Sequence, residues 1–468
     1  MRLETTALTK LWYVCIVAAM GGLLFGYDWV VIGGAKPFYE AYFGLTSPAA
    51  IGWAVSSALI GAMLGVIFCG ISADRLGRKK LLITAAFLLI VSAVGTGLSN
   101  TFTVFILYRI AGGIGVGLSS NLSPMYIAEI SPPHLRGRFV SVNQLTIVVG
   151  ILAAQIVNWM IAEKVPTHYT AEQFLYSWNV QHGWRWMFIA EIVPASLFFI
   201  LMFTLPESPR WLVRRGDHHN ALHVLTKTYN RLYAKEQLDS IKLSLVHETK
   251  KTNFNELLEP GMKKVIGIGI FLAVFQQWCG INIMFNYADE IFSAAGFHVG
   301  DLLFNIIITG IVNVVFTVIA IYTVDRFGRK RLMLLGSAGL AICHGLIALS
   351  YYRATSGLHV LILLVGAIAF FAFSMAPITW VLLSEIYPNR IRAAAMAVSV
   401  LALWASSFVI TYFFPSLNMV LGHAGTFLFF SLFCVIGFVF FSLFLPETKN
   451  KTLEQIELEL VKQTNVIT

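Results

Sequence analysis

The sequence predicts an all-α membrane protein in which twelve transmembrane helices form two pseudo-symmetric six-helix halves, joined by a small cytoplasmic helical linker. Three observations carry this prediction: the composition, the long apolar runs, and motifs that recur in both halves. The chain has 468 residues, of which 57% are hydrophobic and 12% charged. Soluble proteins carry about 25% charged residues. The composition therefore excludes a soluble enzyme, a disordered chain and a nucleic-acid-binding protein.

Runs of apolar residues long enough to cross a bilayer occur twelve times, because a spanning helix needs about 20 such residues. Transmembrane β-strands would instead give alternating segments of about ten residues, so helices are expected. The predicted spans are Leu11–Gly34, Ile51–Ile71, Leu81–Leu98, Phe102–Met125, Phe139–Ala162, Trp186–Leu205, Val265–Tyr287, Leu302–Thr323, Leu332–Tyr351, Val360–Leu383, Ala393–Leu417 and Ala424–Leu445.

Basic residues predict the orientation of these spans. Of the 33 Lys and Arg residues, 28 fall in the two tails and in the loops on the same side as the tails. The positive-inside rule then places both termini in the cytoplasm. The first apolar run is too long for a cleaved signal peptide. Together with outward loops that lack an Asn-x-Ser/Thr acceptor, this predicts a multi-pass protein of a bacterial inner membrane.

The chain repeats three motifs at half-length. Asp74-Arg75-Leu-Gly-Arg78-Lys after the second span returns as Asp325-Arg326-Phe-Gly-Arg329-Lys after the eighth. Glu129-Ile-Ser-Pro-Pro-His-Leu-Arg136 after the fourth span returns as Glu385-Ile-Tyr-Pro-Asn-Arg-Ile-Arg392 after the tenth. Pro-Glu-Ser after the sixth span returns as Pro-Glu-Thr after the twelfth. The predicted parts are an N-terminal half (1–205), a linker (206–264), a C-terminal half (265–445) and a tail (446–468).

Two similar halves suit alternating access, in which one half rocks on the other around a central site. The repeated cytoplasmic loops carry charges that can latch one state and break in the other. The alternative is incidental surface pairing, worth at most about 1 kcal/mol per pair. The predicted gating residues are Asp74, Arg75, Arg78, Glu129, Arg136, Asp325, Arg326, Arg329, Glu385 and Arg392.

The motifs together resemble those of the sugar porter family of the major facilitator superfamily. They are Gly70 with Asp74-Arg75-x-Gly-Arg-Lys, Pro-Glu-Ser-Pro-Arg from 206 to 210, Gln276-Gln277-x-x-Gly-Ile-Asn282, and Pro-Glu-Thr-Lys from 446 to 449. They run along nearly the whole chain, and the resemblance implies the major facilitator fold and sugar transport. The five cysteines all fall in apolar spans without a CxxC pair, so we expect buried, unpaired thiols and neither metal nor cofactor.

Sugars are neutral and rich in hydroxyls, so a site for them needs amides and flat aromatic faces. A straight helix would not turn Gln276 and Asn282 to one side, so we expect a break near Gly280. The resemblance implies that six positions contact sugar and that Trp404 lies near them. Membrane amides can alternatively join helices, worth about 0.6 kcal/mol each. The six positions are Gln144, Gln276, Gln277, Asn282, Asn313 and Trp380.

Three positions depart from the family pattern. Where the family has an amide before the tryptophan that matches Trp404, this chain has Leu403. It has Ala376 in place of the family glycine before the proline of the tenth span, and Asn286 in place of a family tyrosine. The rim of the sugar site therefore differs, and the sequence does not name the sugar.

Three ionisable residues lie within spans, where charge is costly and points to function. They are Asp28 in the first span, Arg109 in the fourth and Glu191 in the sixth, at comparable depth in the N-terminal half. The resemblance implies proton coupling for Asp28 and an acidic residue at Glu191. The alternative is a buried structural ion pair.

The predicted function is proton symport of a monosaccharide, a pentose or hexose of the xylose kind, by alternating access. The partners are then the sugar, a proton and membrane lipid, without nucleic acid, and we expect a monomer. Three alternatives stay open: a sugar or polyol uniporter, a porter-like sugar sensor, and a membrane enzyme. The tail from 446 to 468 is short for a sensor, and no Walker motif or nucleophile with a base supports an enzyme.

Overall fold

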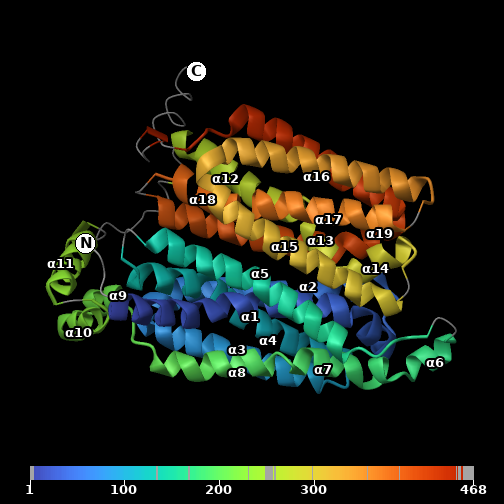
Figure 1. Cartoon of the computed structure of the whole chain (residues 1–468), viewed down its shortest axis with the longest axis horizontal. Helices are drawn as coiled ribbons and strands as arrows, with labels where there is room; N and C mark the ends of the chain where they lie inside the picture. The colour runs from blue at the N-terminus through green and yellow to red at the C-terminus, as the bar shows by residue number, and fades with distance from the viewer. Residues whose placement is uncertain are drawn as a thin grey trace. The chain divides into compact units, whose positions relative to one another are not determined.

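The computed structural model of the chain is built from helices throughout the residues it describes (Figure 1). The described residues are 5–132, 135–166, 169–229, 231–247, 257, 260–297, 299–355, 357–388, 391–449, 451 and 455–456. The helices are α1 (Thr5–Phe43), α2 (Pro48–Leu76), α3 (Arg78–Gly97), α4 (Phe102–Ile130), α5 (Arg136–Ile161), α6 (Ala171–Leu175), the π-helix η1 (Asn179–Gly183), α7 (Trp184–Ile189), α8 (Ile192–Thr204), α9 (Pro209–Arg214), α10 (His218–Thr228), α11 (Arg231–His247), α12 (Pro260–Trp278), α13 (Ile281–Asn286), α14 (Ala288–Ala294), α15 (Val299–Phe327), α16 (Arg329–Tyr352), α17 (Leu358–Phe373), α18 (Met375–Ile386) and α19 (Arg392–Phe444).

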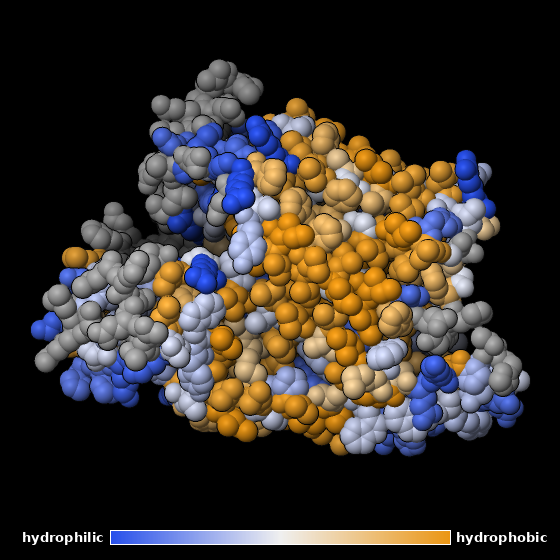
Figure 2. Space-filling model, in the orientation of Figure 1, coloured by the Kyte–Doolittle hydropathy of each residue, from blue (hydrophilic) through white to orange (hydrophobic). Residues whose placement is uncertain are grey.

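Eleven of the described helical segments are long and apolar enough to cross a membrane. They account for the twelve predicted spans to within one residue at each end, because the eleventh and twelfth spans both lie in α19, where the backbone leaves helical geometry at Gly422 (φ 65°, ψ 172°). On the face drawn in Figure 2, apolar side chains cover the middle of these helices and hydrophilic residues gather at helix ends. The hydropathy pattern is therefore that of a polytopic membrane protein.

The chain divides by internal contacts into two units, described here one at a time. Unit 1 comprises Met1–Trp29, Ile60–Ala154 and Arg185–Lys251, and unit 2 comprises Val30–Leu59, Gln155–Trp184 and Thr252–Thr468. The helices α1, α2 and α5 are each shared between the two units, so the units differ from the two sequence repeats.

In unit 1, glycines allow α2 and α4 to approach closely. A Cβ atom on Gly61 of α2 would lie 2.1 Å from the carbonyl oxygen of Ile110 on α4. A Cβ on Gly117 of α4 would lie 2.2 Å from the carbonyl oxygen of Ala62 on α2. The glycine-rich stretch of α4 is therefore a helix-packing surface, the usual role of small residues in membrane helices.

The short helices α9, α10 and α11 of the linker form a small cluster with a core of its own (Figure 1). The Tyr229 hydroxyl fastens this cluster to the membrane helices by donating to the carbonyl oxygen of Ile130, 2.6 Å away. The helical linker predicted from the sequence is thus confirmed in its described residues. The core comprises Leu212, Val213, Ala221, Val224, Leu225, Tyr229, Ala234 and Leu238.

In unit 2, two membrane-spanning segments are interrupted. The seventh span breaks at Gly280, which is left-handed (φ 91°), so that α12 ends and α13 begins in a new direction. The tenth span breaks at Ser374 (φ −123°, ψ −76°) between α17 and α18. The expected break near Gly280 is confirmed. Interrupted helices expose backbone and side-chain polar groups at membrane depth, where transporters bind their substrates.

Candidate transport site

A buried ion pair joins α1 to α4 in unit 1. Arg109 donates from Nη1 to Asp28 Oδ1 at 2.7 Å, and its Nη2 lies 3.4 Å from the Asp28 carbonyl oxygen. Asp28 is 2% exposed and Arg109 1% exposed. The guanidinium also lies over the ring of Phe188, 5.5 Å from its centroid. Burial on this scale makes each charge dependent on the other, since an isolated ion inside a protein is strongly disfavoured.

Glu191 completes a triad with this pair. It lies in the turn between α7 and α8 and is 1% exposed. The charges of Asp28 and Arg109 act on its carboxyl, and Glu191 Oε1 is a buried oxygen with no hydrogen-bond partner among the described residues. One cation balances only one of two buried carboxylates, so the group is neutral only when one carboxyl carries a proton. Asp28, Arg109 and Glu191, which the sequence places at comparable depth, thus form one buried group of one cation and two carboxyls.

The amides of the seventh span form a connected chain in unit 2. Gln277 donates from Nε2 to Gln276 Oε1 at 3.4 Å and accepts on Oε1 from Asn282 Nδ2 at 2.5 Å. Asn282 also donates to the hydroxyl of Ser407 on α19 at 3.0 Å. Gln276 reaches the Met375 carbonyl at the start of α18, 3.3 Å away. The break at Gly280 thus brings together amides that a straight helix would separate.

Side chains of other helices hold the break itself. His344 of α16 is fully buried, and its Nε2 lies 2.9 Å from the carbonyl oxygen of Cys279. Because a carbonyl only accepts, this nitrogen carries the proton. The Cys434 thiol of α19 lies 3.9 Å from the same oxygen. At the last residue of α12, Trp278 donates to the Ser406 carbonyl at 3.0 Å. His344 could not be identified from the sequence, because its partner is a backbone atom far away along the chain.

The remaining predicted sugar residues differ in surroundings. Asn313 on α15 is 3% exposed and Trp404 on α19 is 5% exposed, so both are buried within unit 2. Trp380 on α18 is 39% exposed and presents an open aromatic face. Gln144 is half-buried on α5 and belongs to unit 1. The departures Leu403 and Ala376 are both buried, at 5% and 6% exposure.

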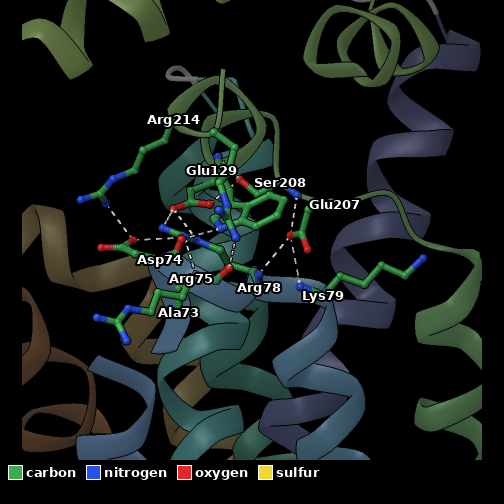
Figure 3. Close-up of polar contacts among 11 residues, drawn as sticks. Ala73, Asp74, Arg75, Arg78, Lys79, Glu129, Glu207, Ser208 and Arg214 are labelled. Carbon is green, nitrogen blue, oxygen red and sulfur yellow. Dashed lines mark hydrogen bonds and ion pairs between the residues drawn. The ribbon is translucent and has the colours of Figure 1, made fainter. Parts of the chain in front are cut away.

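The repeated charged motifs of the first half form a clasp in unit 1 (Figure 3). Arg78 donates from Nη2 and Nε to Glu129 Oε1, at 2.8 and 3.1 Å. Ser208 donates to the second oxygen of Glu129. Glu207 accepts from the backbone N–H of Arg78 at 3.0 Å, at the start of α3. Asp74 pairs with Arg214 of α9 at 2.7 Å. The clasp therefore fastens the linker to the ends of α2, α3 and α4.

The second half repeats this clasp in unit 2. Arg329 pairs with Glu385 at 3.2 Å, and Thr448 donates to the other Glu385 oxygen at 2.6 Å. Glu447 accepts from the backbone N–H of Arg329 at 2.9 Å. Each member corresponds in order to one of the first clasp. The duplication predicted from the motifs is thus a duplication of interactions. The Glu-Ser and Glu-Thr pairs stand in the sequence only as repeats, and their contacts with Arg78 and Arg329 add them to the predicted gating residues.

In each loop, the arginine that meets the glutamate is the second one. Arg75 and Arg326 accept through their backbone carbonyls from Arg215 and Lys449, both at 2.6 Å. Two further predicted gating residues bond to backbone oxygens: Arg136 to Ala128 at 3.1 Å, and Arg392 to Tyr387 at 3.0 Å. The side chain of Asp325 lies outside the described residues.

A second buried ionic group lies on α1, at Lys36. Its ammonium contacts Asp289 at 3.0 Å, Glu290 at 2.5 Å and Glu40 at 3.3 Å. The predicted first span ends at Gly34, which would leave Lys36 in the loop that follows it. The structure corrects this, since α1 continues to Phe43 and Lys36 is 1% exposed.

Comparison with known proteins identifies similar chains. The family model described as "Sugar (and other) transporter" matches residues 14–460. The arabinose-proton symporter of Bacillus subtilis (strain 168) is 40% identical over 450 residues, covering 96% of this chain and 95% of the relative. The D-xylose-proton symporter of Escherichia coli (strain K12) is 40% identical over 475 residues, covering 95% and 94%. The inward open conformation of the xylose transporter XylE from E. coli superposes with a TM-score of 0.83 at 37% identity, covering 96% and 99%.

Proposed function

The chain belongs to the sugar transporter family, and we propose that it imports a monosaccharide by proton symport, with Asp28, Arg109 and Glu191 as the proton site. Two symporters that share 40% of its sequence are named for arabinose and D-xylose, so a pentose is the first substrate to test. The family and these relatives are transporters rather than enzymes. The observation that carries the proposal is the buried triad of one guanidinium and two carboxyls in membrane-spanning helices.

The charge balance of the triad gives proton binding a physical basis. With one proton on the carboxyl pair, the buried group is neutral, whereas loss of that proton leaves one uncompensated negative charge. An uncompensated buried charge costs several kcal/mol, so deprotonation requires water to reach the site. A conformational change that opens the site to water on one side therefore releases the proton on that side, which couples proton transfer to the transport cycle.

Within this triad we assign proton transfer to Asp28. Its carboxyl is the direct partner of Arg109 and lies next to Gly112, where a Cβ atom would lie 3.6 Å from Asp28 Oδ1. When the single proton of the carboxyl pair is on Asp28 rather than on Glu191, the Arg109 guanidinium loses its ion pair with Asp28 and is free to turn to Glu191. This exchange of partners changes the packing of α1 against α4, which is the step that a proton can trigger.

The sugar site is proposed at the amide chain of the broken helix. Gln276, Gln277 and Asn282 each donate and accept, so sugar hydroxyls can replace the hydrogen bonds that these amides make with one another. Trp380 supplies an exposed aromatic face for the C–H surface of a sugar ring. Gln144, Asn313 and Trp404 belong to the proposed site through the family resemblance.

The two clasps are proposed as the cytoplasmic gating elements. Each glutamate at the centre, Glu129 or Glu385, joins one arginine to one hydroxyl from a following segment. The pairs are partly buried, so a rearrangement that separates them exchanges protein contacts for water. We propose that both termini are cytoplasmic, which places these clasps on the inner side of a bacterial inner membrane.

The test is the substitution Asp28→Asn, assayed in proteoliposomes with radiolabelled arabinose and D-xylose. We expect accumulation driven by a pH gradient to be lost, while counterflow exchange of the same sugar continues, because exchange needs no net proton movement. The matched control is Asp239→Asn on α11, an exposed aspartate that pairs with nearby Lys242. Gradient-driven accumulation by Asp28→Asn at the wild-type level would contradict the proton site.

A further inference from the structure

The Lys36 group joins two helices that carry the two halves of the proposed chemistry. Lys36 lies on α1, eight residues after Asp28, which is about 12 Å along a helix. Its partners Asp289 and Glu290 lie on α14, directly after α13, which carries Asn282. The helix of the proton site is thus tied to the continuation of the helix of the sugar site.

The contacts around Lys36 satisfy its ammonium fully. Its three N–H donors face three carboxylates, those of Asp289, Glu290 and Glu40, at 3.0, 2.5 and 3.3 Å. The ring of Tyr287 lies beneath, with its centroid 5.2 Å from Nζ. A buried ammonium needs such partners, because its desolvation is repaid only by close, well-oriented carboxylates.

The backbones of the same two segments are also in close contact. A Cβ atom on Gly33 of α1 would lie 2.3 Å from the carbonyl oxygen of Phe285 on α13. The side of α1 next to Lys36 therefore packs against the broken helix without space for even a methyl group. This contact is independent of charge, and it shows that the ion pairs stand at a closed helix–helix junction.

We propose that Lys36, Asp289 and Glu290 form an outer latch that holds α1 against α14 and closes the transport path on its outer side. The assignment to the outer side rests on the orientation given under the proposed function. The latch has two stable states. With the helices together, the ammonium is paired and dry; with the helices apart, each charge is hydrated. In a partly separated junction the charges are neither paired nor fully hydrated, so partly open conformations are disfavoured.

The latch also explains why Lys36 is tolerated in a membrane helix. Leaving one member of a buried ion pair without its partner is strongly destabilising. Removing Lys36 would place three carboxyls together without a cation, and their mutual repulsion would push α14 from α1. We therefore expect loss of Lys36 to favour the conformation that is open to the outside.

The test measures the distance between spin labels on cysteines introduced at Thr46 and Ser293, in a transport-competent background that lacks the five native cysteines. Both positions are exposed and belong to unit 2. Lys36→Met is expected to raise the ratio of long to short distances by about tenfold or more, since it breaks a buried ion group. The control Lys164→Met removes an exposed lysine and is expected to leave the distances unchanged.

A charge exchange separates the ion pair from simple packing. The double variant Lys36→Asp with Asp289→Lys is expected to restore the short distance that each single variant loses. In transport, Lys36→Met is expected to lower the maximal rate of import without raising the KM for external sugar, because the outward-open state binds external sugar.

Three results would overturn the latch. They are an unchanged distance distribution in Lys36→Met, a charge exchange that fails to restore the short distance, and a raised external KM at an unchanged maximal rate. The distance measurement needs no sugar, so absence of sugar transport by the wild-type protein would refute the proposed function and leave the latch result readable. Asp289→Asn, which leaves Lys36 two carboxylates, supplies a milder variant if Lys36→Met fails to fold.

Discussion

Substituting His344 by leucine should weaken sugar binding, although His344 is not expected to touch the sugar. Its Nε2 lies 2.9 Å from the carbonyl oxygen of Cys279, the residue before the left-handed Gly280. Without this donor, the contact that remains to this carbonyl among the described residues is the long one with the Cys434 thiol, at 3.9 Å. The backbone at the break is then held less firmly, so the positions of Gln277 and Asn282 relative to each other are no longer fixed.

The size of the effect follows from the lost hydrogen bond. A buried acceptor left without its donor costs about 1–3 kcal/mol. The Cys434 thiol compensates in part, so we expect the lower end of that range, and about 1.4 kcal/mol corresponds to a tenfold change in an equilibrium constant. His344→Leu should therefore raise the sugar Kd by about tenfold. His344→Gln keeps an N–H donor of similar reach and should remain within about threefold of the wild type.

The assay is isothermal titration of the purified protein with the transported sugar, together with thermal unfolding of each variant. His359→Leu is the control, because His359 is exposed at the start of α17. Equal loss of affinity in the leucine and glutamine variants would show that ring shape matters rather than the donor. Unchanged affinity in both would show that the break does not depend on His344.

Three further outcomes are expected. Gln277→Leu should raise the sugar KM by at least about tenfold, because Gln277 lies at the centre of the amide chain and its loss removes a hydrogen bond worth about 1.5 kcal/mol; an unchanged KM would place the sugar elsewhere. Gly280→Ala should lower the unfolding temperature and the transport rate, since φ is 91° and a Cβ would lie 3.1 Å from the His344 ring, costing about 1–3 kcal/mol; wild-type values in both measurements would argue against the strained break. Glu129→Gln and Glu385→Gln should each lower the rate of net sugar transport to a similar degree in proteoliposomes, because the two clasps are equivalent, and a defect confined to one would contradict that equivalence.

The sequence predicts most of the fold because the signals for it are local. Apolar runs of spanning length give the helices, and the recurrence of motifs at half-length gives the paired clasps with Glu129 and Glu385. Even the break near Gly280 follows from a local argument, namely that one straight helix cannot present Gln276 and Asn282 on one side. These features need no knowledge of which helices become neighbours.

Other features depend on neighbours that the sequence does not specify. Lys36 looks like a loop charge until α14 supplies Asp289 and Glu290 beside it. His344 looks like an isolated polar residue in an apolar run until the Cys279 carbonyl is placed against it. Both could be suspected from the high cost of burying a charge or a ring nitrogen, but their partners lie on other helices and could not be assigned.

The central claim is that sugar and proton move together through one protein. Its most direct test uses proteoliposomes without an imposed ion gradient or membrane potential. The external pH is recorded while arabinose or D-xylose is added. We predict that sugar entry raises the external pH, that an inwardly directed proton gradient drives sugar above equilibrium, and that a protonophore abolishes that accumulation. Sugar that equilibrates across the membrane without any pH change, and without response to the gradient, would contradict the claim and identify a facilitator.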